Sequence, residues 1–372
     1  MEPADWANLD ALALSLILDN LEERIDHIWF GAVCKSWRST AKIHHQNHQF
    51  KSNVLPMLMF HAEGETRLYS IPGERMYSFP YFEIPMRECM SLYGFHHGWF
   101  ATQNTESRGI TLRNPFKNVA PIHLPPPTPR SYKYCTVYKV TLSADLITSG
   151  NDYVVAAVYN GLIYFKRESQ KCWTIVNIHL QASDIPSECF FTAILFHKGL
   201  IYAVNEMNNI MSFDPFSNEK TTPNMVLQGS YDKDNDIGNV IHDAFSYNYL
   251  VESLEGDLWL VRRLSDREGL GARYKFQVYK LEEQNGKLVR LKSLGDNVLF
   301  VDKFASFSVS ASYFSNCLQK DSIYYHPHIQ SSMEIYFSIY NVKDGSCFHH
   351  YADFRERPAP FTFWIQASFQ WD

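Results

Sequence analysis

The sequence predicts a mainly β protein: a β-propeller of about six blades, with seven possible, preceded by a small all-α helical module. A short turn-and-strand motif recurs five times after residue 55, whereas the first 45 residues carry apolar side chains at helical spacing. Aromatic residues make up 15% of the 372-residue chain, as β-structure favours. We expect a helical module at 1–45, a linker at 46–54 and the propeller at 55–372.

Helical periodicity marks the N-terminal segment. Its apolar residues recur three or four positions apart, with Asn8 or Asp10 placed to cap the first helix. After a charged break at 22–24, a second helix is predicted from the spacing of Ile25, Ile28, Trp29, Ala32, Val33 and Trp37. So small a module buries too little apolar surface to be stable alone. It must pack on the propeller, on a partner chain, or on both.

A repeated motif occurs in the strand-rich part of the chain after residue 55. Each copy has a turn residue, then an apolar residue two positions later and usually an aromatic residue after that. The turn residues are Gly98, Gly161, Gly199, Gly256 and Asp321, and the aromatic residues are Tyr164, Tyr202, Trp259 and Tyr324. We predict that these aromatic side chains pack between blades.

One unit is read as the four strands "YKYCTVYKVTLSA", "DYVVAAVYN", "GLIYFKR" and "CWTIVNI". The segment "PFTFWIQASF" at 360–369 is expected to pair into the first blade and close the ring. A β-sandwich or several small β-domains is the alternative architecture.

Composition excludes several classes of partner. The net charge of −6 and pI near 6.2 provide no basic face for nucleic acid. No signal peptide and no run of about 18 apolar residues is visible, so we expect no membrane and a cytosolic or nuclear location. The seven cysteines are never arranged as CxxC, which favours reduced thiols without disulfides or structural zinc.

No catalytic or cofactor motif stands out. "DKDNDIGNVIHD" at 232–243 has the alternating acids of a calcium loop, but Ile237 stands where such a loop needs glycine, so a solvated acidic loop is the better interpretation. Glu63, Glu65, Glu255 and Asp257 could line a propeller channel as glycosidase carboxylates do, although no spacing singles out an acid and a base. We therefore predict that the chain is not an enzyme and that it binds no cofactor and no metal.

The stretch "GAVCKSWRST" at 31–40 places Cys34 and Trp37 on one helical face. Without a histidine partner nearby, such a cysteine is expected to be a packing residue. Together with Trp6, Leu9 and the Ile17-Leu18 pair, the run Val33-Cys34-Lys35-Ser36-Trp37-Arg38 resembles the F-box of plant proteins over about residues 4–42. One departure is Asp10, where the family usually has a proline. The remainder resembles the kelch-like, propeller-type domain that follows the F-box in a large plant family.

This resemblance implies a substrate receptor of a Skp–cullin–F-box ubiquitin ligase, without bond chemistry of its own. A Skp-type adaptor, and through it a cullin–RING ligase, would bind the apolar helical residues Leu9, Leu14, Ile17, Leu18, Leu21, Ile25, Ile28, Val33, Cys34 and Trp37. Two alternatives stay open: a carbohydrate-binding or hydrolytic propeller enzyme, and an F-box protein that inhibits its target without ubiquitylating it.

Three long segments between predicted strands are candidates for holding the target protein. Propellers present ligands on loops, and tyrosine and arginine anchor protein interfaces more often than other surface residues do. The candidate target-binding residues are Arg130, Tyr132, Tyr231, Asp234, Arg263 and Arg267.

Overall fold

The structure is a computed structural model of the 372-residue chain. It describes residues 6–21, 24–47, 55–62, 65–78, 89–104, 106–117, 119–127, 137–150, 153–159, 161–176, 191–205, 208–217, 223–227, 247–266, 273–326, 335–351 and 362–366. No helix within these ranges is long and apolar enough to cross a membrane.

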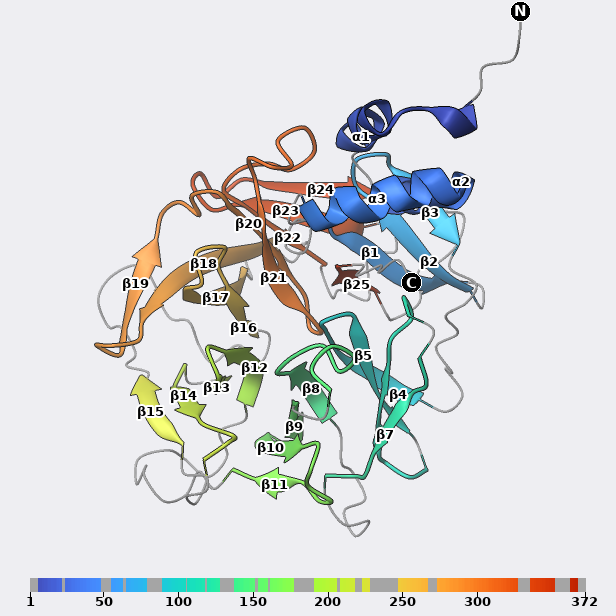
Figure 1. The fold of residues 1–372 in the computed structure, drawn as a ribbon. Coiled ribbons are helices and arrows are strands. Elements are labelled where there is room, and N and C mark those ends of the chain that lie inside the picture. Colours follow the sequence, from blue (N-terminus) through green and yellow to red (C-terminus); the bar gives the residue numbers. More distant parts are fainter. Residues whose placement is uncertain are drawn as a thin grey trace, which may run out of the picture.

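Six β-sheets surround a common axis as the blades of a propeller, and the N-terminal helices lie beside the first blade (Figure 1). The helices are η1 (Trp6–Asn8), α1 (Ala11–Asp19), α2 (Arg24–Val33) and α3 (Lys35–Asn47). The first three blades contain β25 (Thr362–Ile365), β1 (Met57–Ala62), β2 (Glu65–Ser70) and β3 (Arg75–Ser78); β4 (Cys89–His96), β5 (Trp99–Asn104), β6 (Ile110–Arg113) and β7 (Ile122–Leu124); and β8 (Val137–Leu142), β9 (Val154–Tyr159), β10 (Leu162–Arg167) and β11 (Thr174–Ile175).

The last three blades continue the same order around the axis. They contain β12 (Phe191–His197), β13 (Leu200–Asn205), β14 (Ile210–Phe213) and β15 (Asn224–Leu227); β16 (Tyr247–Glu252), β17 (Leu258–Asp266), β18 (Arg273–Glu282) and β19 (Lys287–Leu291); and β20 (Asn297–Val301), β21 (Ser306–Ser310), β22 (Ser322–Tyr325), β23 (Ile335–Asn341) and β24 (Cys347–Tyr351).

The repeated glycines make the tight hairpins within the blades. In the β4–β5 and β12–β13 hairpins both loop residues have positive φ, 50° and 82° at His97-Gly98 and 47° and 82° at Lys198-Gly199. Two consecutive left-handed residues give the turn whose twist matches that of the flanking strands. The aromatic residues of the motif are 1–7% exposed, which confirms that they pack inside the propeller.

The motif does not mark the same strand pair in every blade. In the second, fourth and fifth blades it joins the first two strands in chain order, but in the third it joins β9 to β10, the second and third strands. The four strands expected for that unit are β8 to β11. The sixth blade differs further, because β20 pairs in parallel with β22 and antiparallel with β21, giving a sheet of five strands.

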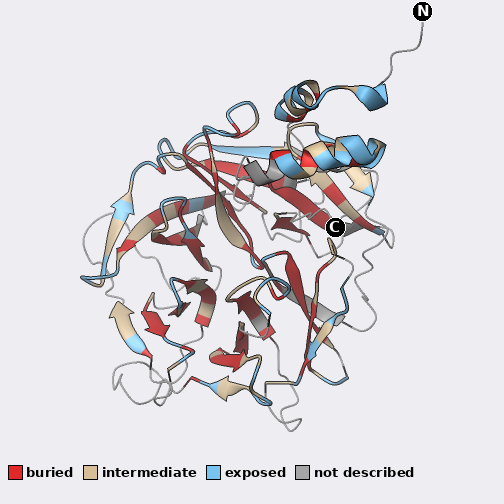
Figure 2. Cartoon of the chain, in the orientation of Figure 1, coloured by how far each residue is buried: buried red, intermediate tan, exposed pale blue. Residues whose placement is uncertain are grey.

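Buried clusters between neighbouring blades form the core. Along β1, Met57 and Met59 pack toward the second blade, whereas Leu58 and Phe60 pack toward the sixth. Successive side chains of a strand point to opposite faces, and both faces are covered here, so nearly every position is apolar. Figure 2 shows the result as blades that are buried through most of their described residues, with exposed surface at the outer strands and the helices.

The end of the chain closes the ring, as the sequence predicted. Strand β25 pairs antiparallel with β1, aligning Trp364 with Leu58 and Phe363 with Met59. Trp364 is fully buried, and its ring lies 4.9 Å from that of Phe300 in the sixth blade. The first blade is therefore built from both ends of the propeller sequence.

Asp302 ties the closing strand to the sixth blade. Its Oδ1 accepts hydrogen bonds from the backbone N–H groups of Phe304 and Ala305 at 2.6 and 2.7 Å, and its Oδ2 accepts one from Trp364 at 2.6 Å. Only 1% of the residue is exposed, and burial raises the pKa of its carboxyl to about 6. One side chain thus shapes the turn after β20 and positions β25.

Replacing Trp364 by alanine should destabilise the propeller by about 3–5 kcal/mol, because the cavity would remove contacts at the closure of the ring. Denaturant unfolding of the full chain measures this loss. Phe348→Ala, at a residue that is 54% exposed on β24, is the matched control and should change stability by under about 1 kcal/mol. Equal losses for the two variants would contradict the proposed role of β25.

Candidate protein-interaction surfaces

The N-terminal helices have a small core of their own. Leu14 and Leu18 of α1 are 1% and 0% exposed and pack with Phe30 of α2 and Ala41 of α3. The partly buried residues around this core are Leu9, Ile17, Leu21 and Trp37. One apolar face of α1 is thus used inside the module.

Polar contacts cap α1 and hold the helices of the module together. The Asp10 carboxylate accepts a hydrogen bond from the backbone N–H of Ala13 at 2.9 Å and so caps α1. Asp10, which stands where the F-box pattern usually has proline, therefore begins α1 as its N-cap residue. His44 of α3 contacts the Asp19 carboxylate at 2.8 Å, and the Trp37 indole donates to the carbonyl of Trp6 at 2.9 Å.

Further apolar side chains of the helices remain exposed. On α1, Leu12 and Leu16 are 72% and 56% exposed, and their spacing of four residues places them on one face, away from Leu14 and Leu18. On α2, Trp29 and Val33 repeat this spacing and are also more than half exposed. A helix with apolar residues all round is typical of one covered on more than one side. We call Leu12 and Leu16 the α1 outer face.

Trp29 also links the helices to the propeller. Its ring meets Tyr77 of β3 edge-on, with 5.6 Å between the ring centroids. In Figure 1, α2 and α3 lie alongside the first blade and α1 lies farther from it. The α1 outer face is therefore carried on the helix that is farthest from the propeller in this view.

The residues predicted to bind an adaptor fall into three groups in the structure. Leu14 and Leu18 form the module core, and Val33 is exposed. Leu9, Ile17, Leu21, Cys34 and Trp37 are half-buried, and the side chains of Ile25 and Ile28 lie outside the described part of the chain. The sequence reasoning missed Leu12 and Leu16. The signal was present, because every position from Leu16 to Leu18, as well as Leu12 and Leu14, is apolar.

Five of the six predicted target-binding residues lie outside the described residues: Arg130, Tyr132, Tyr231, Asp234 and Arg267. The sixth, Arg263, is not on a loop. It lies in β17, is 1% exposed, and its guanidinium stacks 4.3 Å from the ring of Tyr247 and 4.5 Å from that of Tyr274. Cation–π contacts on both sides stabilise the buried charge.

The carboxylates considered for hydrolysis are dispersed. Glu65 lies in the first blade, Glu255 and Asp257 lie in the fifth, and Glu63 is outside the described residues. Glu255 accepts a hydrogen bond from the Asn297 amide at 3.0 Å, and Asp257 pairs with Lys280 at 2.6 Å. Within the described ranges, no group of three or more His, Cys, Asp or Glu side chains is placed to hold a metal ion.

Comparison with known proteins identifies the family of the propeller. Residues 68–346 match the family described as the KIB1-4 beta-propeller. An Arabidopsis thaliana protein that carries an F-box name is 26% identical over 95% of this chain and 98% of its own length. F-box protein SKIP23, also from Arabidopsis thaliana, is 24% identical over 87% of this chain and 84% of that protein.

Among solved structures, TolB from Acinetobacter baumannii aligns with a TM-score of 0.42 at 12% identity, covering 88% of this chain and 71% of that one. The family match spans well over half of the chain, and the F-box relatives span nearly all of it. This chain therefore belongs to the KIB1-4 beta-propeller family and is a plant F-box protein with that propeller.

Proposed function

We propose that this chain is the substrate-recognition subunit of a Skp–cullin–F-box ubiquitin ligase. Its helices bind a Skp-type adaptor, and its propeller holds a target protein. The observation that carries the proposal is the α1 outer face, where two leucines of the helical module are more than half exposed. Relatives that align with this chain over 98% of their own length carry F-box names, which supports the same role.

An adaptor would stabilise this surface through the hydrophobic effect. Burying one leucine side chain contributes about 1.5–3 kcal/mol, so covering Leu12 and Leu16 together offsets much of the cost of association. The half-buried residues predicted from the sequence, such as Ile17 and Leu21, would support this contact from beside it. Leu14 and Leu18 act indirectly, by holding α1 against α2 and α3.

The receptor itself makes or breaks no bond in this proposal. The cullin–RING part of the ligase brings the ubiquitin-charged enzyme, and the propeller raises the effective concentration of the target's lysines beside it. We place this activity in the cytosol or nucleus. The division into a helical module at 1–45, a linker at 46–54 and a propeller at 55–372 is part of the same proposal.

Charging the α1 outer face should abolish adaptor binding. In a Leu12→Asp, Leu16→Asp double variant, the contact would bury two unpaired carboxylates, each costing several kcal/mol. Titration calorimetry with a plant Skp-type adaptor measures the loss. Leu254→Asp, at a propeller residue that is 39% exposed, is the matched control and should bind normally. Wild-type affinity in the double variant would reject this face as the adaptor site.

Leu18→Ala should act differently, because Leu18 is fully buried in the helical core. We expect the module to lose about 2–5 kcal/mol and the chain to lose helical circular dichroism, with the propeller still folded. Adaptor binding then falls together with helical content. By contrast, the double variant of the outer face should keep its helical signal while losing the adaptor.

A reconstituted ligase tests the receptor role itself. Wild-type chain, adaptor, cullin–RING ligase and ubiquitin-charging enzymes are mixed with proteins that the propeller captures from plant extract. Capture followed by adaptor-dependent ubiquitylation is the expected result. Capture without ubiquitylation would support the inhibitory alternative, and turnover of a carbohydrate by the chain without adaptor would support the enzyme alternative.

A further inference from the structure

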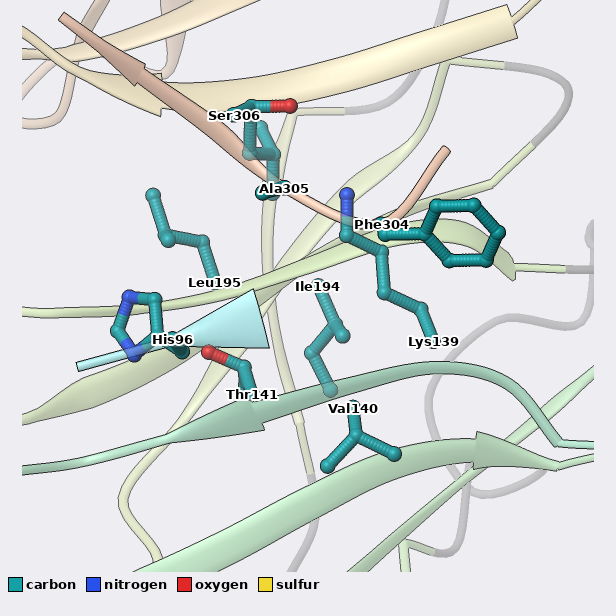
Figure 3. A pocket seen from close by; sticks show the side chains of 10 residues that line it. His96, Lys139, Val140, Thr141, Ile194, Leu195, Phe304, Ala305 and Ser306 are labelled. Atoms are coloured by element: carbon teal, nitrogen blue, oxygen red, sulfur yellow. The ribbon is translucent and has the colours of Figure 1, made fainter. Parts of the chain in front are cut away.

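The hollow near the propeller axis is too small to hold a target protein. It is lined by His96, Lys139 and Thr141 among other residues and has room for about one water molecule (Figure 3). A bound water can satisfy the polar side chains buried there, but no segment of a target fits. The target must therefore bind elsewhere on the propeller, and the exposed apolar side chains indicate where.

The turns of the propeller lie at its two ends. Successive antiparallel strands reverse direction, so the turn after the first strand of a four-stranded blade lies at the same end as the turn after its third strand. The second and third blades agree with this, because Lys117, between β6 and β7, pairs with Asp145, after β8, at 2.8 Å. His197 and Glu252, at the ends of β12 and β16, join the fourth and fifth blades in the same way at 2.9 Å.

The sixth blade presents the segment after β21 at this same end. The N–H of Leu254, in the β16–β17 turn, donates to Asn297 Oδ1 at the start of β20 at 2.8 Å. Asn297 aligns with Ser310, the last residue of β21, so β21 also ends here. We call this end of the ring the hairpin end. Its described residues include 114–117, 119–121, 143–150, 214–217, 253–257 and 311–313.

Exposed apolar side chains of the propeller gather at the hairpin end. Within the described blades and turns, seven large apolar side chains are exposed. The five at the hairpin end are Val119, Ile147, Phe216, Leu254 and Tyr313. The other two, Ile175 and Phe348, lie in the outer strands β11 and β24. Single exposed apolar residues are ordinary, but their concentration on one side is typical of an interaction surface.

Hydrogen bonds connect the turns that carry Leu254 and Tyr313. Asp296, next to Asn297, accepts a hydrogen bond from the Ser310 hydroxyl at 2.6 Å. Ser310 Oγ in turn accepts one from the N–H of Tyr313 at 3.0 Å. Together with the bond from Leu254 to Asn297, these contacts order both turns across the fifth and sixth blades. Such order lowers the entropic cost of forming an interface here.

Two carboxylates beside these turns are ionised. Glu255 follows Leu254 in the chain, and Asp296 precedes Asn297. Burial raises the pKa of each carboxyl, but hydrogen bonds outweigh burial and hold both pKa values below their usual range. In the described part of the chain, neither carboxylate has an ion-pair partner, and Lys320 attracts Asp296 from farther away.

Neighbouring lysines of the fourth and fifth blades are already paired. Lys198 contacts the Glu283 carboxylate at 3.1 Å, and Lys280 contacts Asp257 at 2.6 Å. These lysines therefore do not neutralise Glu255. The exposed side chain of Leu254 thus lies in surroundings with an excess of negative charge.

We propose that the turns around Leu254 and Tyr313 hold a basic, partly apolar segment of the target protein. This inference rests on the proposed role as a target receptor. Apolar side chains of the segment cover Leu254 and Tyr313, and its lysine or arginine side chains pair with Glu255 and Asp296. The same carboxylates repel an acidic segment. None of the six residues predicted from the sequence to bind the target belongs to these turns.

Fluorescence polarisation with two labelled synthetic peptides tests this surface. One peptide alternates lysine and leucine, and the other has glutamate in place of each lysine. At near-physiological ionic strength, the full chain should bind the first peptide and not the second. In a Leu254→Ala, Tyr313→Ala double variant, we expect affinity for the first peptide to fall at least about tenfold, because both apolar anchors are truncated.

Glu255→Lys tests the charge separately. It should weaken binding of the lysine–leucine peptide about tenfold or more, because repulsion replaces attraction. Glu65→Lys, at an exposed residue of β2 in the first blade, makes the same change in net charge and should keep wild-type affinity. Equal losses in the two charge reversals would mean nonspecific attraction and would overturn the proposal. Absence of binding to the wild type would overturn it as well.

Adaptor binding separates this proposal from the receptor role. All these variants should bind a Skp-type adaptor as the wild type does, because the α1 outer face is unchanged. Wild-type peptide affinity in the Leu254 and Tyr313 double variant would reject this surface and leave the receptor role standing. Sedimentation that showed a dimer dissociated by Leu254→Asp would assign the surface to a second copy of the chain and reject the proposal too.

Discussion

The propeller depends on the contact that closes its ring. Four backbone positions of β25 align with β1, and the Asp302 carboxylate holds the N–H of Trp364 from the sixth blade. Without β25, the first blade would lose one strand and expose the edge of β1. Because each interblade cluster needs a blade on both sides, an opening at this point would also uncover the cluster that contains Trp364. The closure therefore stabilises both the first blade and the cluster between the first and sixth blades.

The closed ring also buries two charged side chains, Lys139 and Asp302. Lys139 and Asp302 are both almost completely buried and lie on different blades. Asp302 is stabilised by three backbone N–H groups, whereas Lys139 has no comparable set of acceptors among the described residues. The same geometry that fixes the last strand thus leaves a buried cation on the third blade that has no ion-pair partner among the described residues.

The helical module buries its apolar residues differently from the propeller blades. A blade buries both faces against its neighbours, whereas α1 buries Leu14 and Leu18 internally and leaves Leu12 and Leu16 outside. Among the described residues, Trp29 of the module contacts Tyr77 of the first blade. An adaptor on the outer face would bury the apolar side chains that the module itself leaves exposed.

The sequence by itself determined the class of each part. Alternating apolar runs, glycine turns and the terminal aromatic segment predicted the propeller and its closure, because strand burial and turn conformation depend on local residue order. Helical spacing and the "AVCKSWRS" run predicted the N-terminal module in the same way. Only the tertiary structure decided which apolar face of α1 is internal, that Arg263 lies buried between two tyrosines, and that Lys139, Thr141, His96 and Ser306 meet at the axis. Those contacts join residues far apart in the chain, so no local pattern encodes them.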